Sequence, residues 1–402
     1  MGSSVKLLKK KVARLFKANR VDVHSTHTYT KPAPSVYEQQ WLWDSCFHAI
    51  VQRWIDPELA KQELHAVVAH QVETGNQAGM IPHMNYWDNA GSELWGIAHR
   101  SIITQPPIIA YAAVRIYEVS PDKDFLFSLY EPLSNYHHWL RKTRDPDNDN
   151  LVSIIHPWES GWDASQRWDR ILKLNKPTDD ASKLERLKLV LALKTYDCDP
   201  DALEQQNYFS VEAIDFNSIR IADMESLAEI ARILKKNDDH TYWMGIVRKA
   251  QKAVHDKMVM QKFYDLAGTA EKPIRVNNAA KFISMFGESI TQDEASDLVK
   301  HMTSTKYWPN FGITTTPTTS DTFAPDRYWR GNIWPSVNWL IYKGLKRYHF
   351  DEVAKNLAEN FIKLVLEHGF WEYYNPLTGE GLGAENCSWS ALALAMAIEE
   401  DI

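Results

Sequence analysis

The chain has 402 residues, of which 44% are hydrophobic, and a formal net charge of −7. A chain of this length buries a large core, and a repetitive architecture can hold all of it in one domain. An acidic sequence whose only basic cluster is the short run Lys6 to Lys11 excludes nucleic acid as an expected partner. Three scattered cysteines give no disulfide framework, and no segment has the length of a signal peptide core or a membrane span. We expect a cytoplasmic protein with a small-molecule ligand and no membrane partner. A homo-oligomer is a possibility that the sequence leaves open.

Helical periodicity dominates the sequence. Apolar residues recur at three- and four-residue spacing, as in an amphipathic helix, in many segments. In chain order these are Pro57 to Thr74, Pro106 to Ser120, Asp124 to Thr143, Phe216 to Lys236, His240 to Met258, Thr291 to Met302, Trp334 to Tyr348 and Phe350 to Gly369. Thr291 and Glu294 form the pattern of a capping box, and Gly75 and Gly369 are the expected helix stops.

The arrangement of these helices predicts the fold class. Alternating strand patterns are few and short, so the chain is expected to be all-α. Helix pairs joined by alternating short and long loops favour a closed toroid of helical hairpins. No linker divides the chain, so we expect one domain over residues 1–402, with residues 173–207 as a helical insertion or lid.

Five loops share an unusual composition, and Trp is abundant in the chain, with 16 residues. Each loop combines Trp or Tyr with acids, amides or Arg, and indole faces stack well on the C–H faces of sugars. The loops are Tyr37 to Phe47, Gly79 to Trp87, His156 to Asp169, Asp326 to Pro335 and Phe370 to Trp389. Packing alone is a poor explanation for five such loops, so a sugar-binding site is predicted, with Tyr86 of the second loop among its aromatic residues.

The third loop contains the predicted acid catalyst. Hydrolysis of a glycosidic bond needs a carboxylic acid that stays protonated near neutral pH. Asp163 is flanked by Trp158, Trp162 and Trp168, and the partial desolvation expected there raises the pKa of a carboxyl. The alternative is a capping or turn-forming Asp. Glu159 and Asp169 of the same loop are expected to bind a hydroxyl or a nearby Arg, such as Arg167 or Arg170.

The fifth loop offers the second carboxylate. Glu372, between Trp371 and Tyr373, is the first candidate, and Glu380 and Glu385 follow. This group must attack the anomeric carbon or activate a water, and the separation of the two carboxyls decides between retention and inversion.

Two further residues have both a sugar-binding and a structural interpretation. Arg330, between Trp329 and Trp334, can donate a fork of hydrogen bonds to sugar hydroxyls or to an anionic aglycone, or it can pair with Asp326. Asp44 can accept hydrogen bonds from adjacent sugar hydroxyls, or it can cap the following helix.

Other chemistry has little support in the sequence. There is no phosphate-binding glycine loop and no metal-binding His pattern, so no cofactor and no metal is expected. Residues Asp145 to Asn150 resemble the first half of a calcium loop, without its Gly and closing Glu. A solvated turn is the favoured interpretation, and opportunistic calcium binding is the alternative.

The motifs WLWDSCF, GMIPHM, PWESGWD, RYWRGNIWP and WEYYNPLTGEG…SWSALAL together resemble glycoside hydrolase family 63. They are most similar to its compact bacterial branch of mannosylglycerate and glucosylglycerate hydrolases, over residues 35–395. The resemblance implies a catalytic (α/α)6 barrel and inversion at an α-glucoside or α-mannoside. It also implies that Asp163 is the general acid and that Glu372, rather than Glu380 or Glu385, is the general base.

The resemblance also implies a set of binding residues. Those expected to line the sugar site are Tyr37, Trp41, Trp43, Asp44, Trp158, Gly161, Trp329 and Trp334. Gln105 and Tyr328 are expected to reach the aglycone. The family usually has a small or thioether residue before the acid, whereas this chain has Trp162, which is expected to narrow the pocket or to change the aglycone. No Arg in residues 188–209 matches the one that holds glycerate in the family.

The sequence therefore predicts an inverting, exo-acting glycosidase for a terminal α-glucosyl or α-mannosyl residue of a small glycoside. A sugar epimerase on the same toroid is one alternative, and it needs paired His, for which His83 and His156 are the nearest candidates. A non-catalytic carbohydrate-binding protein is the other, and it needs aromatic residues without two acids in one pocket.

Overall fold

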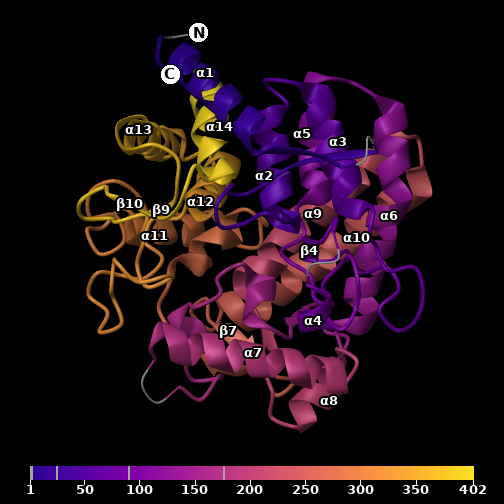
Figure 1. Cartoon of the computed structure of the whole chain (residues 1–402). Coiled ribbons are helices and arrows are strands. Elements are labelled where there is room, and N and C mark those ends of the chain that lie inside the picture. The colour runs from indigo at the N-terminus through magenta and orange to yellow at the C-terminus, as the bar shows by residue number, and fades with distance from the viewer. Residues whose placement is uncertain (1–2, 24–25, 89–90, 175–176) are drawn as a thin grey trace.

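A computed structural model of the chain describes residues 3–23, 26–88, 91–174 and 177–402 (Figure 1). Its secondary structure is mostly α-helical, and α1 and α14 bring the two ends of the chain close together (Figure 1). The α-helices are α1 (Ser3–Asn19), α2 (Leu42–Gln52), α3 (Pro57–Val68), α4 (Ser92–Trp95), α5 (Ile109–Val119), α6 (Lys123–Thr143), α7 (Asp179–Thr195), α8 (Pro200–Gln205), α9 (Ile214–Ile233), α10 (Asn237–Ala253), α11 (Gln292–Met302), α12 (Pro335–Arg347), α13 (Asp351–His368) and α14 (Leu392–Glu399).

An inner ring of helices forms the centre of the molecule. Going round the ring, α2 packs on α5, α5 on α9, α9 on the 3-10 helix η4 (Ala279–Met285), η4 on α12, α12 on α14, and α14 on α2 again. The inner helices are buried on most faces, and every residue of α2 and of η4 is buried. A helix that is buried all round must be surrounded by protein, and the closed ring provides this.

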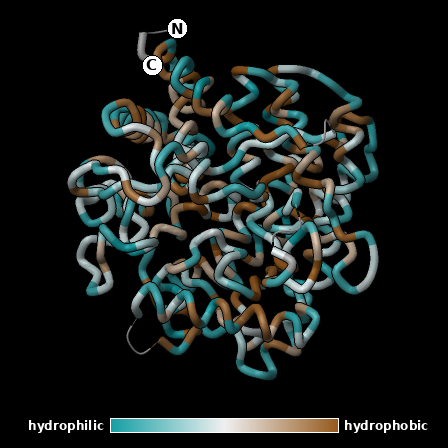
Figure 2. The backbone as a smooth tube through the Cα atoms, in the orientation of Figure 1, coloured by the Kyte–Doolittle hydropathy of each residue, from teal (hydrophilic) through white to brown (hydrophobic). Residues whose placement is uncertain are grey.

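An outer layer covers the ring. Each outer helix packs against an inner one: α3 on α2, α6 on α5, α10 on α9, α11 on η4, α13 on α12 and α1 on α14. These helices have one apolar face and one polar face, and in Figure 2 α13 alternates hydrophobic and hydrophilic colours along its turns. The paired layers make the (α/α)6 barrel that the resemblance implied.

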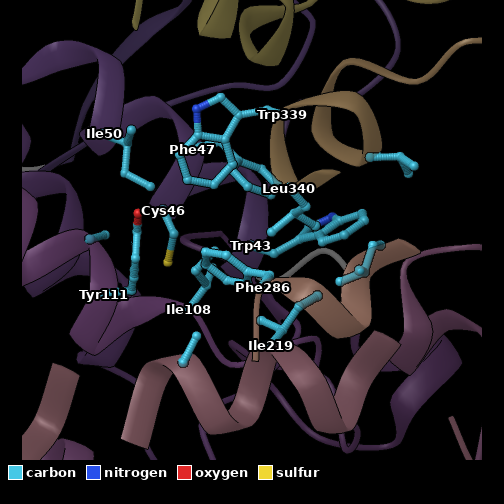
Figure 3. Packing of buried hydrophobic residues seen from close by; sticks show 14 of the residues in the cluster. Trp43, Cys46, Phe47, Ile50, Ile108, Tyr111, Ile219, Phe286, Trp339 and Leu340 are labelled. Carbon is cyan, nitrogen blue, oxygen red and sulfur yellow. The ribbon is translucent and has the colours of Figure 1, made fainter. Parts of the chain in front are cut away.

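The interior of the ring is filled by side chains. Figure 3 shows Phe47 of α2, Tyr111 of α5, Ile219 of α9, Phe286 after η4 and Trp339 of α12 converging. All of them are buried. The barrel therefore has no open channel at this level, and a ligand site must lie among the loops at one end.

The loops contain short antiparallel strands. β1 (Arg20–Val23) pairs with β2 (His27–Thr30), β3 (Gln40–Trp41) with β4 (Met84–Asn85), and β9 (Trp371–Tyr374) with β10 (Gly381–Glu385). A four-stranded sheet has the order β5 (Ser153–Ile154), β6 (Val211–Glu212), β7 (Asp265–Ala267) and β8 (Lys272–Ile274). The β3–β4 and β9–β10 pairs contain two predicted site residues, Trp41 and Glu372.

Two local predictions are confirmed and one is wrong. The capping box of Thr291 and Glu294 begins α11, and Gly369, with φ of +91°, follows the last residue of α13. Gly75 does not end a helix, because α3 already ends at Val68. The backbone of Val72 instead bonds with that of Gly79 and Met80, which turns the chain into a compact loop.

The predicted insertion at residues 173–207 contains α7 and α8, at the end of the molecule opposite the termini (Figure 1). Its role as a lid stays a prediction. Among the described residues, no helix is both long enough and apolar enough to cross a membrane.

Candidate active site

A cavity of about 320 Å³ lies where the predicted chemical loops meet. Most of the residues predicted from the sequence line it. These are Tyr37, Trp41, Trp43, Asp44, Tyr86, Gln105, Trp158, Gly161, Asp163, Tyr328, Trp329 and Glu372. Asp163 and Glu372, which are 209 positions apart in the sequence, thus line one cavity, as the closure of the barrel requires.

Asp163 is presented by a tightly turned loop. The 3-10 helix η1 (Pro157–Ser160) is capped by His156 and ends at Gly161, whose φ is +74°. A side chain at Gly161 would be strained by this φ and would also collide with the indole of Trp43. Ser165, and not Asp163, caps the next 3-10 turn, η2 (Gln166–Trp168), so the capping alternative for Asp163 does not apply.

The environment of Asp163 suits a proton donor. Burial raises the pKa of its carboxyl to about 7, and the charge of Glu372 raises it further, while the Arg186 guanidinium opposes the shift. A carboxylic acid with a pKa near neutrality is protonated for much of the time at neutral pH and can give its proton to a leaving group.

Glu372 has a different environment. It lies on β9, where Tyr37 donates to its Oε1 at 2.9 Å and the backbone N–H of Ala384 donates to its Oε2 at 2.9 Å. Burial raises the pKa of Glu372, and hydrogen bonds from Ala384, Tyr37 and Tyr328 oppose that rise. Donors that point at both oxygens favour the ionised form, which a base or nucleophile needs.

A third carboxyl, Asp44, lies in the first turn of α2 and also lines the cavity. Burial raises its pKa to about 8, with further contributions from the charges of Glu372 and Asp163. Three acids in one cavity repel each other, so at neutral pH they share protons. Donors such as sugar hydroxyls would stabilise the ionised form of Asp44 when a ligand binds.

Aromatic rings make up much of the wall. The imidazole of His83 stacks on Trp158 with ring centroids 6.3 Å apart, and Trp95 meets Trp158 edge-on at 5.9 Å. The indole N–H of Trp95 donates to Tyr86 at 2.9 Å, which orients both rings. Flat apolar faces with polar edges are the surfaces on which sugar rings stack.

Arg330 and Trp334 were expected in the sugar site, but the structure places them behind it. Arg330 is 1% exposed and donates to both carboxylate oxygens of Asp169, at 2.6 and 2.7 Å. Trp334 is fully buried and stacks behind Trp329. The fork of donors that made Arg330 a candidate for sugar hydroxyls is used inside the protein, and the partner is Asp169 rather than Asp326.

The remaining acids of the third loop are also paired. Glu159 accepts two hydrogen bonds from Arg144 and others from the backbone N–H groups of Thr104 and Ile155. The prediction that Glu159 and Asp169 pair with an Arg is confirmed, but the suggested partners, Arg167 and Arg170, are wrong. Arg167 and Arg170 were suggested because they are close in the sequence, whereas the observed partners, Arg144 and Arg330, come from other segments.

Several lining residues were not predicted as site residues. They are Pro32, His83, Met84, Leu94, Trp95, Cys387 and Trp389. His83, Met84, Cys387 and Trp389 lie within the five loops, so their composition was a usable signal. Pro32, Leu94 and Trp95 lie outside the loops and carried no signal.

Arg186 was also missed. It lies on α7, donates to the backbone oxygen of Asp163 at 3.0 Å and to Ser182 at 2.6 Å. It precedes residues 188–209, where the sequence was searched for an Arg. Its place beside the predicted acid follows only from the folding of α7 over the third loop.

One group of acids outside the cavity lining has the spacing of a cation site. In the part of the chain that the structure describes, only Asp145, Asp147 and Asp149 place carboxylate oxygens within 4.8 Å of one another. Lys257 donates to Asp149 at 2.5 Å and also contacts Glu271, so a protein cation already lies beside this loop.

A family model described as the mannosylglycerate hydrolase MGH1-like glycoside hydrolase domain matches residues 37–390. The chain belongs to this family of glycosidases, within glycoside hydrolase family 63. Both candidate catalytic carboxyls lie inside the matched range.

This glycosidase aligns with several relatives over nearly the whole length of both chains. It is 33% identical to the mannosylglycerate hydrolase of Thermus thermophilus, over 93% of this chain and 97% of the relative. It is 28% identical to the glucosylglycerate hydrolase of Mycolicibacterium hassiacum, over 91% of this chain and 93% of the relative. A crystal structure of a mannosylglycerate hydrolase from Thermus thermophilus, in complex with Tris and D-glycerate, matches with a TM-score of 0.87 at 30% identity. That match covers 98% of this chain and all of the other.

Proposed function

We propose that this glycosidase is an inverting, exo-acting enzyme that removes a terminal α-mannosyl or α-glucosyl residue from a small glycoside of the glycosyl-glycerate type. The observation that carries the proposal is the pair Asp163, half-buried, and Glu372, buried, two carboxyls that line one cavity in contrasting environments. Environments that separate the protonation of two carboxyls are what assign acid and base roles in glycosidases.

In the proposed reaction, Asp163 gives its proton to the glycosidic oxygen as the bond from that oxygen to the anomeric carbon breaks. Glu372 accepts a proton from a water whose oxygen attacks the anomeric carbon on the opposite face. The released sugar then has the inverted configuration. Glu372 loses its proton to solvent and Asp163 regains one from solvent, which restores the starting state. Tyr37 and the N–H of Ala384 hold Glu372 in place, which keeps the water aligned.

The size and the polarity of the cavity support a small substrate. Small-molecule sites have volumes of about 300–1,000 Å³, and this cavity of about 320 Å³ is at the lower end. Asp44 is the group proposed to accept hydrogen bonds from sugar hydroxyls. Gln105 and Tyr328, which also line the cavity, are proposed to contact the aglycone.

An anionic aglycone such as glycerate needs a compensating cation. A carboxylate beside Asp163 would otherwise raise the pKa of that acid further and be repelled by Asp44 and Glu372. Arg186 is the cation whose charge acts on Asp163. Arg186 does not line the cavity, so we propose that it favours a glycerate-like aglycone through its charge rather than by direct contact.

The test is hydrolysis of mannosylglycerate, glucosylglycerate and neutral α-linked disaccharides, followed by proton NMR of the first sugar released. We expect the β-anomer from an α-linked substrate, with glycosyl-glycerates preferred. The initial appearance of the α-anomer would rule out inversion, and exclusive hydrolysis of long oligosaccharides from internal bonds would rule out exo action.

A further inference from the structure

A column of stacked aromatic rings runs along one wall of the cavity, and one of its members, Trp329, lines the cavity. The column consists of Trp162, Trp329, Trp334 and Tyr373. Successive ring centroids are 5.1, 3.5 and 4.7 Å apart, and the planes of successive rings differ by only 22°, 5° and 23°. The separations of the two outer pairs are those of favourable offset stacking, whereas Trp329 and Trp334 lie almost directly face to face. The four rings are therefore in continuous contact from one end of the column to the other.

The two ends of the column are the immediate neighbours of the two catalytic carboxyls. Trp162 directly precedes Asp163, and Tyr373 directly follows Glu372. The loop that carries Asp163 and the strand β9 that carries Glu372 are far apart in the sequence. The two central rings, Trp329 and Trp334, come from the segment before α12 and connect them. A change in ring packing at either end therefore changes where one carboxyl lies relative to the other.

The acid end of the column is fixed to the barrel. The Arg167 guanidinium lies 4.7 Å from the ring centre of Trp162 and 4.3 Å from that of Trp168. Arg167 in turn donates to Asp215 at 2.8 and 3.0 Å and to Asp265 at 3.2 Å, and all of these groups are buried. A buried, doubly paired guanidinium has one position, so Trp162 is held against α9 and β7.

The centre of the column stores strain. Trp329 has φ of +62°, a left-handed backbone conformation that is costly for a bulky side chain. Among the described residues, the indole N–H groups of Trp329 and Trp334 have no hydrogen-bond partner. Ring contacts therefore orient these two indoles, by stacking between Trp162 and Tyr373 and by the edge-on packing of Tyr328 and Trp389. Trp329 also lines the cavity, so the orientation of its ring shapes the surface that a ligand would contact.

We propose that the column of Trp162, Trp329, Trp334 and Tyr373 is a positioning device that sets the separation between the carboxyls of Asp163 and Glu372. The inference rests on the proposed roles of these two acids. Trp162 and Tyr373 are positioning residues, because neither lines the cavity and each acts through the carboxyl beside it. The device matters for an inverting glycosidase, in which the separation must leave room for one water.

The test uses variants at the two ends of the column. Trp162→Leu and Tyr373→Leu each remove a stacked ring, whereas Tyr373→Phe keeps the ring and loses only the hydroxyl. Trp243→Leu is the matched control, because Trp243 is an equally buried Trp that packs on His137 and His138, away from the cavity. It measures what the loss of a buried indole does to folding alone.

Crystal structures of the variants give the first readout, which needs no substrate. We expect the distance between the carboxyl carbons of Asp163 and Glu372 to change by about 1 Å in Trp162→Leu and Tyr373→Leu. Tyr373→Phe and Trp243→Leu should keep the wild-type distance. An unchanged distance in both column variants would overturn the proposal even if the wild-type enzyme proved inactive on every glycosyl-glycerate.

Kinetics on mannosylglycerate or glucosylglycerate give the second readout. A misplacement of about 1 Å costs roughly 100-fold in rate, so kcat should fall by about that factor in both column variants while KM stays within about threefold. Tyr373→Phe should restore kcat to within about threefold of wild type. The double variant should lose little more than either single variant, because both break the same connection. If Trp243→Leu loses as much kcat as the column variants, the column has no positioning role beyond ordinary core packing.

Discussion

The substitution Asp163→Asn should make the enzyme less active and, at alkaline pH, more stable. The reason is that the fold holds this carboxyl in an environment that disfavours its charge. Its pKa is about 7 in the folded protein, against an ordinary value of 3.8. A folded pKa that lies above the unfolded one means that the folded state binds the proton more tightly, so stability is lost as the pH rises from about 4 to 7. Asparagine does not ionise and avoids this loss.

The magnitude follows from the same two values. A gap of about three pH units corresponds to roughly 4 kcal/mol at most, since each unit is worth about 1.4 kcal/mol. Asp163 faces the cavity and is not fully shielded from water, so we expect about half of this, roughly 2 kcal/mol. The melting temperature of Asp163→Asn should therefore exceed that of the wild type by a few degrees at pH 8, and by less at pH 5. Loss of the proton donor should lower kcat by about 10² to 10⁴.

Calorimetry at pH 5 and pH 8, with kcat on a glycosyl-glycerate, measures both effects. Asp169→Asn is the matched control, because it makes the same chemical change in the same loop. It removes the charge that pairs with the buried guanidinium of Arg330 and should lower the melting temperature at both pH values. A wild-type Tm that equals or exceeds that of Asp163→Asn at pH 8 would refute the idea that Asp163 is held against its charge.

Other predictions concern the remaining groups of the site. The alkaline limb of kcat/KM should lie near pH 7, where Asp163 loses its proton, and the acid limb should lie above the ordinary Glu pKa of 4.5, where Glu372 gains one; a rate that stays flat from pH 6 to 9 would contradict this. Tyr37→Phe removes a donor to Glu372 and should move the acid limb to higher pH while lowering kcat about tenfold, which a full pH profile tests. Gly383→Ala places a Cβ against Glu372 at a φ of +74° and should lower both kcat and Tm, whereas Gly245→Ala, in open space on α10, should raise Tm slightly. Arg186→Met should raise KM for a glycosyl-glycerate more than for the methyl glycoside of the same sugar, and equal effects on both would argue against an effect of the Arg186 charge on an anionic aglycone.

The sequence by itself determined the class of fold and the chemistry. Helical periodicity is a local property, since an amphipathic helix must repeat its apolar residues every three or four positions to bury one face. The helices α11, α12 and α13 were accordingly predicted to within a few residues. A carboxyl among indoles is also readable from one loop, because neighbours in the sequence of a short loop remain neighbours in space. Asp163 was found in this way.

Residues in different loops could not be paired from the sequence. Arg330 and Glu159 looked like candidates for ligand binding or for local ion pairs, and their true partners, Asp169 and Arg144, come from other parts of the fold. A charged side chain can satisfy itself with any opposite charge within reach, and only the packed structure decides which one is near. Arg186 was missed for the same reason. It contacts the loop that carries Asp163 because α7 folds across that loop.

The relation between the two carboxyls belongs wholly to the tertiary structure. Asp163 and Glu372 meet because the ring of inner helices closes, with α14 packed again on α2. Their neighbours Trp162 and Tyr373 are joined by Trp329 and Trp334, whose stacking is a matter of ångströms and of ring angles that no local pattern encodes. The sequence alone identified the carboxyls that we propose transfer protons, and the closed barrel alone brings them to one cavity.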